Sequence, residues 1–126
     1  MSGEPVMVSV RTLNGYHHEI RFRGRTFEAD EPEVAGGTDR GPVPEEMLLG
    51  SLGSSVAITM LMYARRKEWP LTAVELDLRR SGDRIEKLVR LRGDLDSDQR
   101  KRLLEVGDHC PVERMLSHGI PIERLA

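Results

Sequence analysis

Cys110 is the residue of this sequence whose type and position are best suited to nucleophilic chemistry. It precedes Pro111, where we expect a short helix to begin, and it follows His109. The positive end of a helix dipole and a protonated histidine both favour the thiolate, which is the reactive form of a cysteine. A small buried hydrophobe is the usual role of a free cysteine and is the other interpretation. The sequence leaves both open.

Three serines, Ser51, Ser54 and Ser55, form a second candidate group. They lie within an uncharged run of the chain, residues 47–64, which reads MLLGSLGSSVAITMLMYA. Serine within a helix commonly bonds back to its own backbone and allows close packing. No Gly-x-Ser-x-Gly motif is present, so the sequence gives no support for hydrolase chemistry at these serines.

The uncharged run is the centre of a predicted long helix over residues 44–67. Glu45 and Glu46 stand at its start and three basic residues at its end, as the helix dipole favours. Proline at the start and Trp69-Pro70 after the end suit the two boundaries. A helix that is apolar on nearly every side must be buried in protein or in lipid.

A buried helix is the better of these two interpretations. A membrane span needs about 20 apolar residues, and glycines, serines and a threonine lower the hydropathy of this shorter run. The N-terminal residues contain Glu4 and no apolar run, so we expect no signal peptide and no membrane association. We expect one domain, 1–126. A domain of this size has few residues outside the helix with which to cover all of its sides. That favours a homodimer.

Composition narrows the function classes. The 19 basic and 21 acidic residues balance, and aromatic residues make up 4%, so we expect no nucleic-acid partner. A single cysteine excludes an internal disulfide framework and favours a cytoplasmic location. We expect no cofactor and no metal, because His17 and His18 point to opposite faces of a strand. The Gly36–Gly41 segment lacks the phosphate-binding motifs of nucleotide folds.

Alternating apolar residues predict strands, and turn residues separate them. We expect a strand through Val6–Val10, a turn at Asn14-Gly15, and strands at 18–22 and 26–29. A loop at 30–43 precedes the long helix. Further along, the pattern predicts a hairpin of strands around 74–78 and 85–91, helices at about 97–107 and 110–116, and a last strand at 120–125. Hairpins between helices indicate an α+β fold with antiparallel sheets.

Three segments together resemble one known family, the OsmC/Ohr family of osmotically induced proteins and organic hydroperoxide reductases. They are GGTDRGPVPEEMLLGSLGSS, YARRKEWPL and DHCPVERML, and the similarity extends from about Asp30 onward. The resemblance implies an α+β, OsmC-like fold: an intertwined homodimer in which a long central buried helix is wrapped by antiparallel sheets. It also implies two active sites at the subunit interface.

The family's working members reduce peroxides with two cysteines, one in the long helix and one in a Cys-Pro-Val element. By this resemblance Cys110 matches the second, resolving cysteine, and Glu45 matches a glutamate at the start of the long helix. The first, peroxidatic position falls on Ser55. The family also uses an arginine, for which the sequence leaves these candidates open: Arg21, Arg23, Arg25 and Arg40.

Ser55 is the departure that matters, because a hydroxyl cannot form the sulfenic acid that begins the cycle. Our leading interpretation is a protein that keeps the fold and interface cleft but not the two-cysteine cycle. It would bind a small apolar or peroxide ligand or serve a stress role. A one-cysteine peroxidase using Cys110 and an external thiol is the alternative. A third interpretation uses Ser55 as a nucleophile and needs a base within hydrogen-bond reach.

Overall fold

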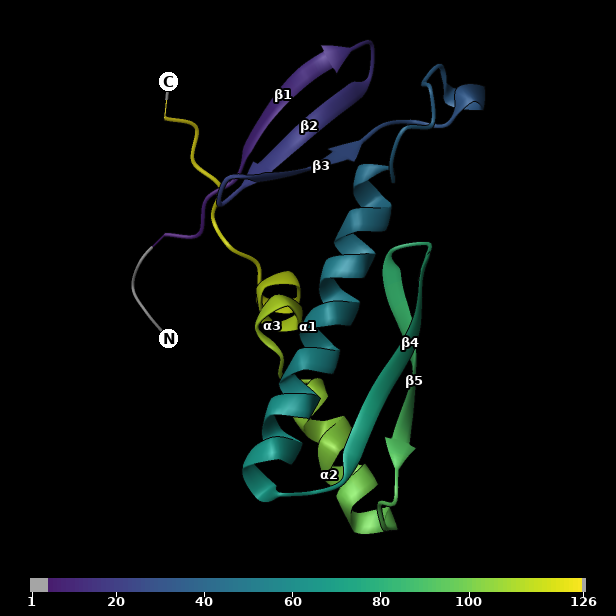
Figure 1. Ribbon diagram of the computed structural model, residues 1–126, viewed down its shortest axis with the longest axis vertical. Helices are drawn as coiled ribbons and strands as arrows, with labels where there is room; N and C mark the ends of the chain where they lie inside the picture. The colour runs from purple at the N-terminus through teal and green to yellow at the C-terminus, as the bar shows by residue number, and fades with distance from the viewer. Residues whose placement is uncertain (1–4, 126) are drawn as a thin grey trace. The chain divides into compact units, whose positions relative to one another are not determined.

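The computed structural model describes residues 5–125 and divides the chain into two compact units, Met1–Leu48 and Leu49–Ala126. The order of elements is βββ, a long helix, a β-hairpin and two further helices (Figure 1). The chain is therefore α+β with antiparallel sheets, as the sequence predicts. The expectation of a single domain stays a prediction.

The first unit is built on a three-stranded antiparallel sheet, β1 (Ser9–Asn14), β2 (His17–Phe22) and β3 (Arg25–Ala29). The predicted turn after Asn14 is confirmed, and Gly15 takes the positive φ of 57° that this two-residue connection requires. The β2–β3 connection is also two residues long, with φ of 47° at Arg23 and 76° at Gly24. These tight turns fix the register of the sheet.

Asp30 organises the loop that leads from this sheet to the long helix. It is buried, and its carboxylate accepts hydrogen bonds from the Thr38 hydroxyl at 2.6 Å and from three backbone N–H groups. Those groups belong to Glu31, Thr38 and Arg40, at 2.7, 3.3 and 3.1 Å. The Asp30 side chain thus holds together a loop of ten residues. This loop includes a short 3-10 helix, Glu33–Ala35.

The long helix α1 runs from Pro44 to Lys67, the bounds that the sequence predicts. By length and composition alone it could cross a membrane, a test that the core helix of a globular protein also passes. Its buried residues are Leu52, Gly53, Val56, Met60 and Ala64, which recur every three or four positions and so form one face. The second unit covers this face.

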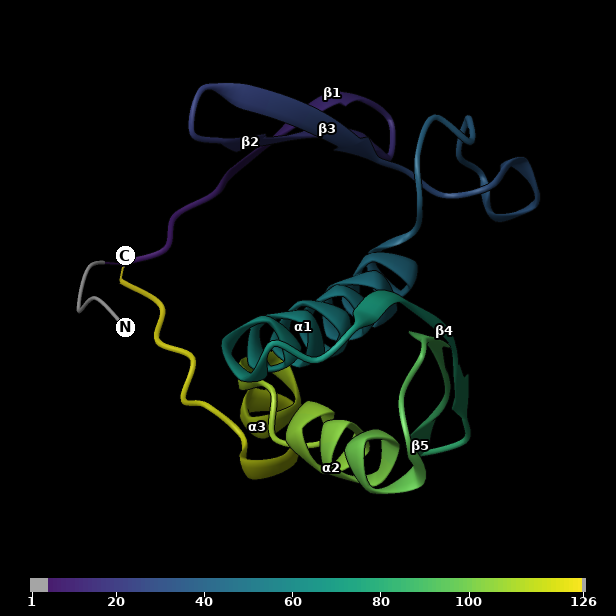
Figure 2. The same cartoon turned by 60° about the horizontal axis from the view of Figure 1, so that its bottom comes forward.

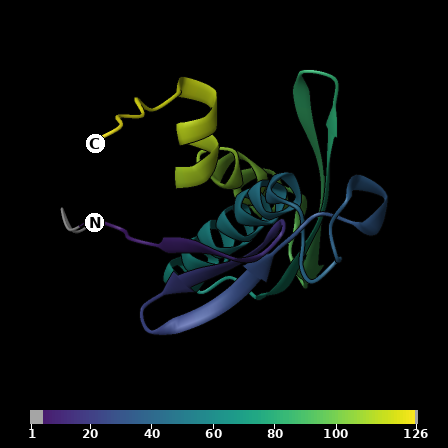
Figure 3. The ribbon, with the colours of Figure 1, turned by 90° about the horizontal axis from the view of Figure 1, so that it is seen from above.

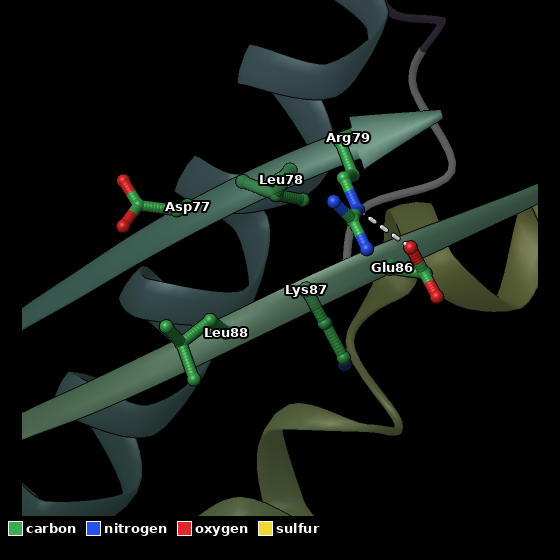
Figure 4. A pocket seen from close by; sticks show the side chains of 6 residues that line it. All are labelled: Asp77, Leu78, Arg79, Glu86, Lys87 and Leu88. Atoms are coloured by element: carbon green, nitrogen blue, oxygen red, sulfur yellow. Dashed lines mark hydrogen bonds and ion pairs between the residues drawn. The ribbon is translucent and has the colours of Figure 1, made fainter. Parts of the chain in front are cut away.

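A two-stranded hairpin, β4 (Leu71–Ser81) and β5 (Arg84–Gly93), packs against α1 with one face. Its other face carries opposite charges across the strands. Arg79 pairs with Glu86 at 2.6 Å (Figure 4), and Arg90 pairs with Asp77 at 2.9 Å. Cross-strand ion pairs of this kind suit a solvated sheet face. The alternation therefore separates an apolar, core-facing side from a charged one.

Two helices complete the second unit, α2 (Ser97–Gly107) and α3 (Pro111–His118). Asp96 caps α2 in a reciprocal capping box with Gln99. Figure 2 shows the hairpin, α2 and α3 gathered around α1. The core between these elements consists of the following buried residues, with partly buried strand residues packed on them: Leu52, Val56, Met60, Ala64, Leu95, Leu103 and Cys110.

Two strand predictions are wrong in part or whole. The first strand begins at Ser9, not at Val6. Its pairing with β2 starts at Ser9 and Arg21, and β2 ends one residue later, at Phe22, so it leaves no partner for an earlier start. The segment 120–125 forms no strand: it has no partner strand within the described residues 5–125, and Pro121 lacks a backbone donor. The alternation there reflects composition rather than pairing.

Asp30 gives the first unit a defined acid sensitivity. Hydrogen bonds, that of Thr38 first, lower the pKa of Asp30 to about 2 against the opposing effect of desolvation. The ionised form is therefore the one that closes the loop. Its contribution is complete above the ordinary pKa of 3.8 and is lost as the pH falls through about 2.

We predict that the Thr38 and Arg40 amide resonances report this loss in an NMR titration from pH 5 to pH 2. Asp30→Asn should disorder the loop already at neutral pH, because an amide side chain cannot accept this set of hydrogen bonds. Asp39→Asn, an exposed change in the same loop, should leave the titration as it is. An unchanged loop in Asp30→Asn would contradict the role assigned to Asp30.

Candidate functional site

The hydroxyl of Ser55 lies at the start of α3. Its Oγ accepts a hydrogen bond from the backbone N–H of Val112 at 3.4 Å. Val112 follows Cys110-Pro111, so the structure places Ser55 against the segment that contains the only cysteine. Within residues 5–125, Ser55 makes no hydrogen bond to a histidine or a carboxylate, so no base of the kind that the third interpretation needs is in place.

Cys110 is the N-cap of α3 and is completely buried, with an exposed fraction of 0%. Its Sγ accepts a hydrogen bond from the Glu113 N–H at 3.4 Å. Two N–H groups in the first turn of α3 are therefore satisfied by Ser55 Oγ and Cys110 Sγ. These groups have no partner inside a helix, so the two side chains together cap α3.

His109 does not face the thiol. Its Nδ1 donates to the Glu105 carbonyl at 2.9 Å, which returns the ring to the last turn of α2. Ser54 Oγ likewise donates to the Ser51 carbonyl at 3.1 Å, the backbone interaction that a helical serine commonly makes. Neither residue takes part in the Ser55–Cys110 arrangement.

Lys87 on β5 holds the segment around Cys110 from the strand side. Its Nζ contacts Asp108 Oδ1 at 2.8 Å and Glu113 Oε1 at 2.5 Å, one residue on each side of the α3 start. Burial acts to lower the pKa of Lys87, but hydrogen bonds to Asp108 and Glu113 outweigh it and raise the pKa. Lys87 is therefore a cation clamped between two carboxylates, and Figure 4 shows its side chain beneath the hairpin.

A cavity of about 350 Å³ opens beside this clamp, between the tip of the hairpin and α3. The hairpin and α3 can be followed in Figure 3, in green and yellow. The lining of the cavity combines apolar with polar side chains. The apolar ones are Leu52, Ile85 and Leu116, and the polar ones are Asp83, Lys87, Glu113 and Ser117. A second hollow of about 400 Å³, shown in Figure 4, lies along the hairpin itself.

The remaining predicted site residues belong to the first unit. Glu45 lies in the first turn of α1, where Glu46 beside it accepts a hydrogen bond from the Val43 N–H at 2.8 Å. Arg21 pairs with Glu19 at 3.5 Å, and Arg40 donates its N–H to Asp30. Arg23 lies over the ring of Phe22, and Arg25 begins β3. The structure brings together Ser55 and the Cys110 segment, and the choice among the arginines stays open.

Sequence reasoning missed the Lys87 clamp. Lys87 occupies a core-facing position in an otherwise apolar alternation, between Ile85 and Val89. That misplaced charge was the available signal, because a lysine on a buried face requires acidic partners. The two histidines that the sequence raised for metal binding turn elsewhere: His17 contacts Glu28 at 2.5 Å, and His18 contacts Thr12 at 2.8 Å.

The family model described as OsmC-like protein matches residues 37–124, which is more than half of the chain. This protein therefore belongs to the OsmC-like family. The family match spans α1 and α3, and so includes both Ser55 and Cys110. No curated protein matches the sequence significantly.

Solved structures show the same fold at low sequence identity. A putative osmotic stress induced and detoxification response protein from Psychrobacter arcticus has a TM-score of 0.76 at 16% identity, covering 90% of this chain and 89% of that one. An OsmC-like protein from Mycoplasma pneumoniae has a TM-score of 0.75 at 14% identity, covering 94% and 91%.

A third structure carries a ligand. It is a putative organic hydroperoxide resistance protein from Vibrio cholerae, with captopril bound in one of its active sites. Its TM-score is 0.60 at 16% identity, covering 93% of this chain and 88% of that chain. At this level of identity the likeness establishes the fold alone.

The clamp leads to a prediction about Cys110. Lys87→Met should lower the free energy of unfolding by about 1–2 kcal/mol, because it leaves two carboxylates without their cation. It should also expose Cys110, so that a thiol reagent reacts faster with the folded variant than with the wild type. Reaction rates with 5,5′-dithiobis(2-nitrobenzoate), with stability from urea unfolding, provide the test.

Arg90→Gln is the matched control, because it removes one cation of a solvent-exposed ion pair on the opposite face of the same strand. It should change the stability by a few tenths of a kcal/mol and leave the thiol protected. Equal thiol protection in Lys87→Met and the wild type would show that Lys87 does not hold this segment.

Proposed function

We propose that this protein is an OsmC-like protein that binds a small apolar or peroxide ligand in a stress-related role and does not run the two-cysteine peroxidase cycle. The hydrogen bond between Ser55 Oγ and the Val112 N–H carries this proposal. Through this hydrogen bond the hydroxyl of Ser55, rather than a second thiol, lies next to the segment that contains Cys110.

The chemistry of the family cycle explains why this exchange matters. A thiolate attacks the peroxide oxygen, releasing an alcohol and leaving a sulfenic acid, and a second thiol then condenses with it and releases water. An external dithiol reduces the resulting disulfide. This chain has one cysteine, so its own thiols cannot supply both the attacking group and the condensing group. The hydroxyl of Ser55 is too weak an acid to replace the missing thiolate.

The one-cysteine alternative has Cys110 attack the peroxide itself. It requires a thiol that a peroxide and an external reductant can reach. Cys110 is instead completely buried, caps α3 through its sulfur, and lies behind the Lys87 clamp. A structural thiol in this setting is inert. These contacts support the ligand-binding proposal over the alternative.

The cavity beside the clamp is a suitable place for a small ligand. Leu52, three residues before Ser55, joins Ile85 and Leu116 as its apolar lining, and charged groups stand at its margin. The lining is mixed, with three apolar side chains against four polar or charged ones, so it offers both apolar contact and hydrogen-bonding groups to a small molecule. The captopril in the Vibrio cholerae protein is a precedent for a small molecule in one of that protein's active sites.

We further propose that the protein acts as a homodimer in the cytoplasm. The face of α1 turned away from its own hairpin carries exposed apolar residues, with Ile58 52% and Met62 64% exposed. Serines on the same side, Ser51 and Ser54, would let a second helix approach closely. Large apolar side chains exposed together on one helix face are typical of a subunit interface. In a dimer, a partner's first unit is available to supply the family's arginine and glutamate.

A peroxidase assay tests the main proposal. We expect the wild type to leave cumene hydroperoxide unconsumed in the presence of dihydrolipoamide. Ser55→Cys should gain turnover, because it restores the second sulfur beside Cys110. Ser55→Cys combined with Cys110→Ser should lose that gain.

Wild-type turnover that Cys110→Ser abolishes would overturn the proposal and establish Cys110 as a stand-alone nucleophile. Inert protein in both the wild type and Ser55→Cys would show that the cleft has lost more than one sulfur. Ligand binding is measured in the same samples by calorimetry with cumyl alcohol. The inert wild type should still bind this alcohol.

The dimer has its own test. Met62→Glu places a charge on the exposed apolar face of α1 and should convert a dimer into a monomer, measured by light scattering after size-exclusion chromatography. Val34→Glu, at an isolated exposed position in the loop before α1, should leave the mass unchanged. A wild type that is monomeric at micromolar concentration would contradict the proposed assembly.

A further inference from the structure

A cluster of positive charge surrounds Tyr63 at the end of α1, apart from the Ser55–Cys110 arrangement. The charged ends of Arg66, Lys67 and Arg102 lie 5.6, 5.7 and 5.3 Å from the centre of the Tyr63 ring. Arg66 and Lys67 follow Tyr63 by three and four residues and so share its helix face. Arg102 comes from α2, so two separate helices direct cations to one ring.

Neutralising partners are few here. Arg102 contacts Glu105 at 3.4 Å, and this is the one ion pair that the three cations make within residues 5–125. The helix dipole accounts for cations in the last turn of α1, but it does not account for Arg102. Interactions with the ring offset only part of the mutual repulsion of three like charges. A bound anion would relieve that repulsion.

Tyr63 adds a hydrogen-bond donor to the cluster. Its hydroxyl oxygen accepts from Arg102 Nε at 3.1 Å, and its proton has no acceptor within the described part of the chain. The Arg102 hydrogen bond, with the nearby positive charges, lowers the pKa of Tyr63 against the effect of desolvation. A more acidic hydroxyl is a stronger donor, so an anion oxygen beside it would be well bound.

We propose that Tyr63, Arg66, Lys67 and Arg102 form a binding site for a small polyphosphate anion, the diphosphate group being the unit recognised. Guanidinium groups match phosphate oxygens in pairs, and the ammonium group adds a point charge. Three cations match a ligand of two or three negative charges. A long polyanion is a poorer fit, because the whole chain has a net charge of −2.

Trp69 makes the site directly measurable. It is the only tryptophan of the chain, and its ring meets the Tyr63 ring edge to face with centres 5.6 Å apart. We expect inorganic pyrophosphate to change Trp69 fluorescence saturably in the full-length protein, at constant ionic strength. Arg66→Gln should weaken this binding about tenfold, as the loss of a charge-assisted hydrogen bond does. Tyr63→Phe should weaken it severalfold while keeping the ring.

Arg65→Gln is the matched control: it removes the same charge from the same turn of α1, but Arg65 does not contact Tyr63. It should change pyrophosphate binding less than twofold. Equal weakening by Arg65→Gln and Arg66→Gln, or the same response to chloride as to pyrophosphate, would reduce the effect to general charge screening and overturn the proposal. Tighter binding of a single-stranded oligonucleotide than of pyrophosphate would replace the small anion with a nucleic acid.

Discussion

The need to cover α1 governs this structure. A helix of 24 residues with an uncharged central run cannot remain in water on any side, and its own second unit covers one face. The hairpin brings apolar alternation to that face, and α2 and α3 bring Leu103 and Cys110. Everything that positions the candidate site, from Ser55 on α1 to the start of α3, follows from this packing. The face left over is the physical basis for expecting a second chain.

The start of α3 gives Ser55 and Cys110 a structural role, whatever else they do. A helix that begins inside a protein needs acceptors for its first N–H groups, and buried groups without partners are costly. Ser55 and Cys110 provide two of these acceptors. Their side chains are therefore occupied in holding α3 in place, and Lys87 holds the same segment through its flanking carboxylates. The residues that the family resemblance marks as chemical thus also have structural roles here.

Much of the fold was accessible from the sequence because its local signals are strong. The bounds of α1 followed from an uncharged run between acids and bases, and the first hairpin followed from Asn14-Gly15. Where pairing decides, local pattern failed: residues 120–125 alternate like a strand, yet no strand pairs with them in the described chain. Long-range contacts were equally hidden. Nothing local connects Lys87 to Glu113 or Tyr63 to Arg102, which are 26 and 39 residues apart.

The joint between α1 and α3 has a consequence for the conditions in which the protein holds its shape. A disulfide at this joint would form and break with the reduction potential of its surroundings, and helix α3 would be more or less firmly attached accordingly. A hydrogen bond from a backbone N–H to a serine oxygen has no such dependence. The hydrogen bond that attaches α3 to α1 is therefore the same in reducing and oxidising surroundings.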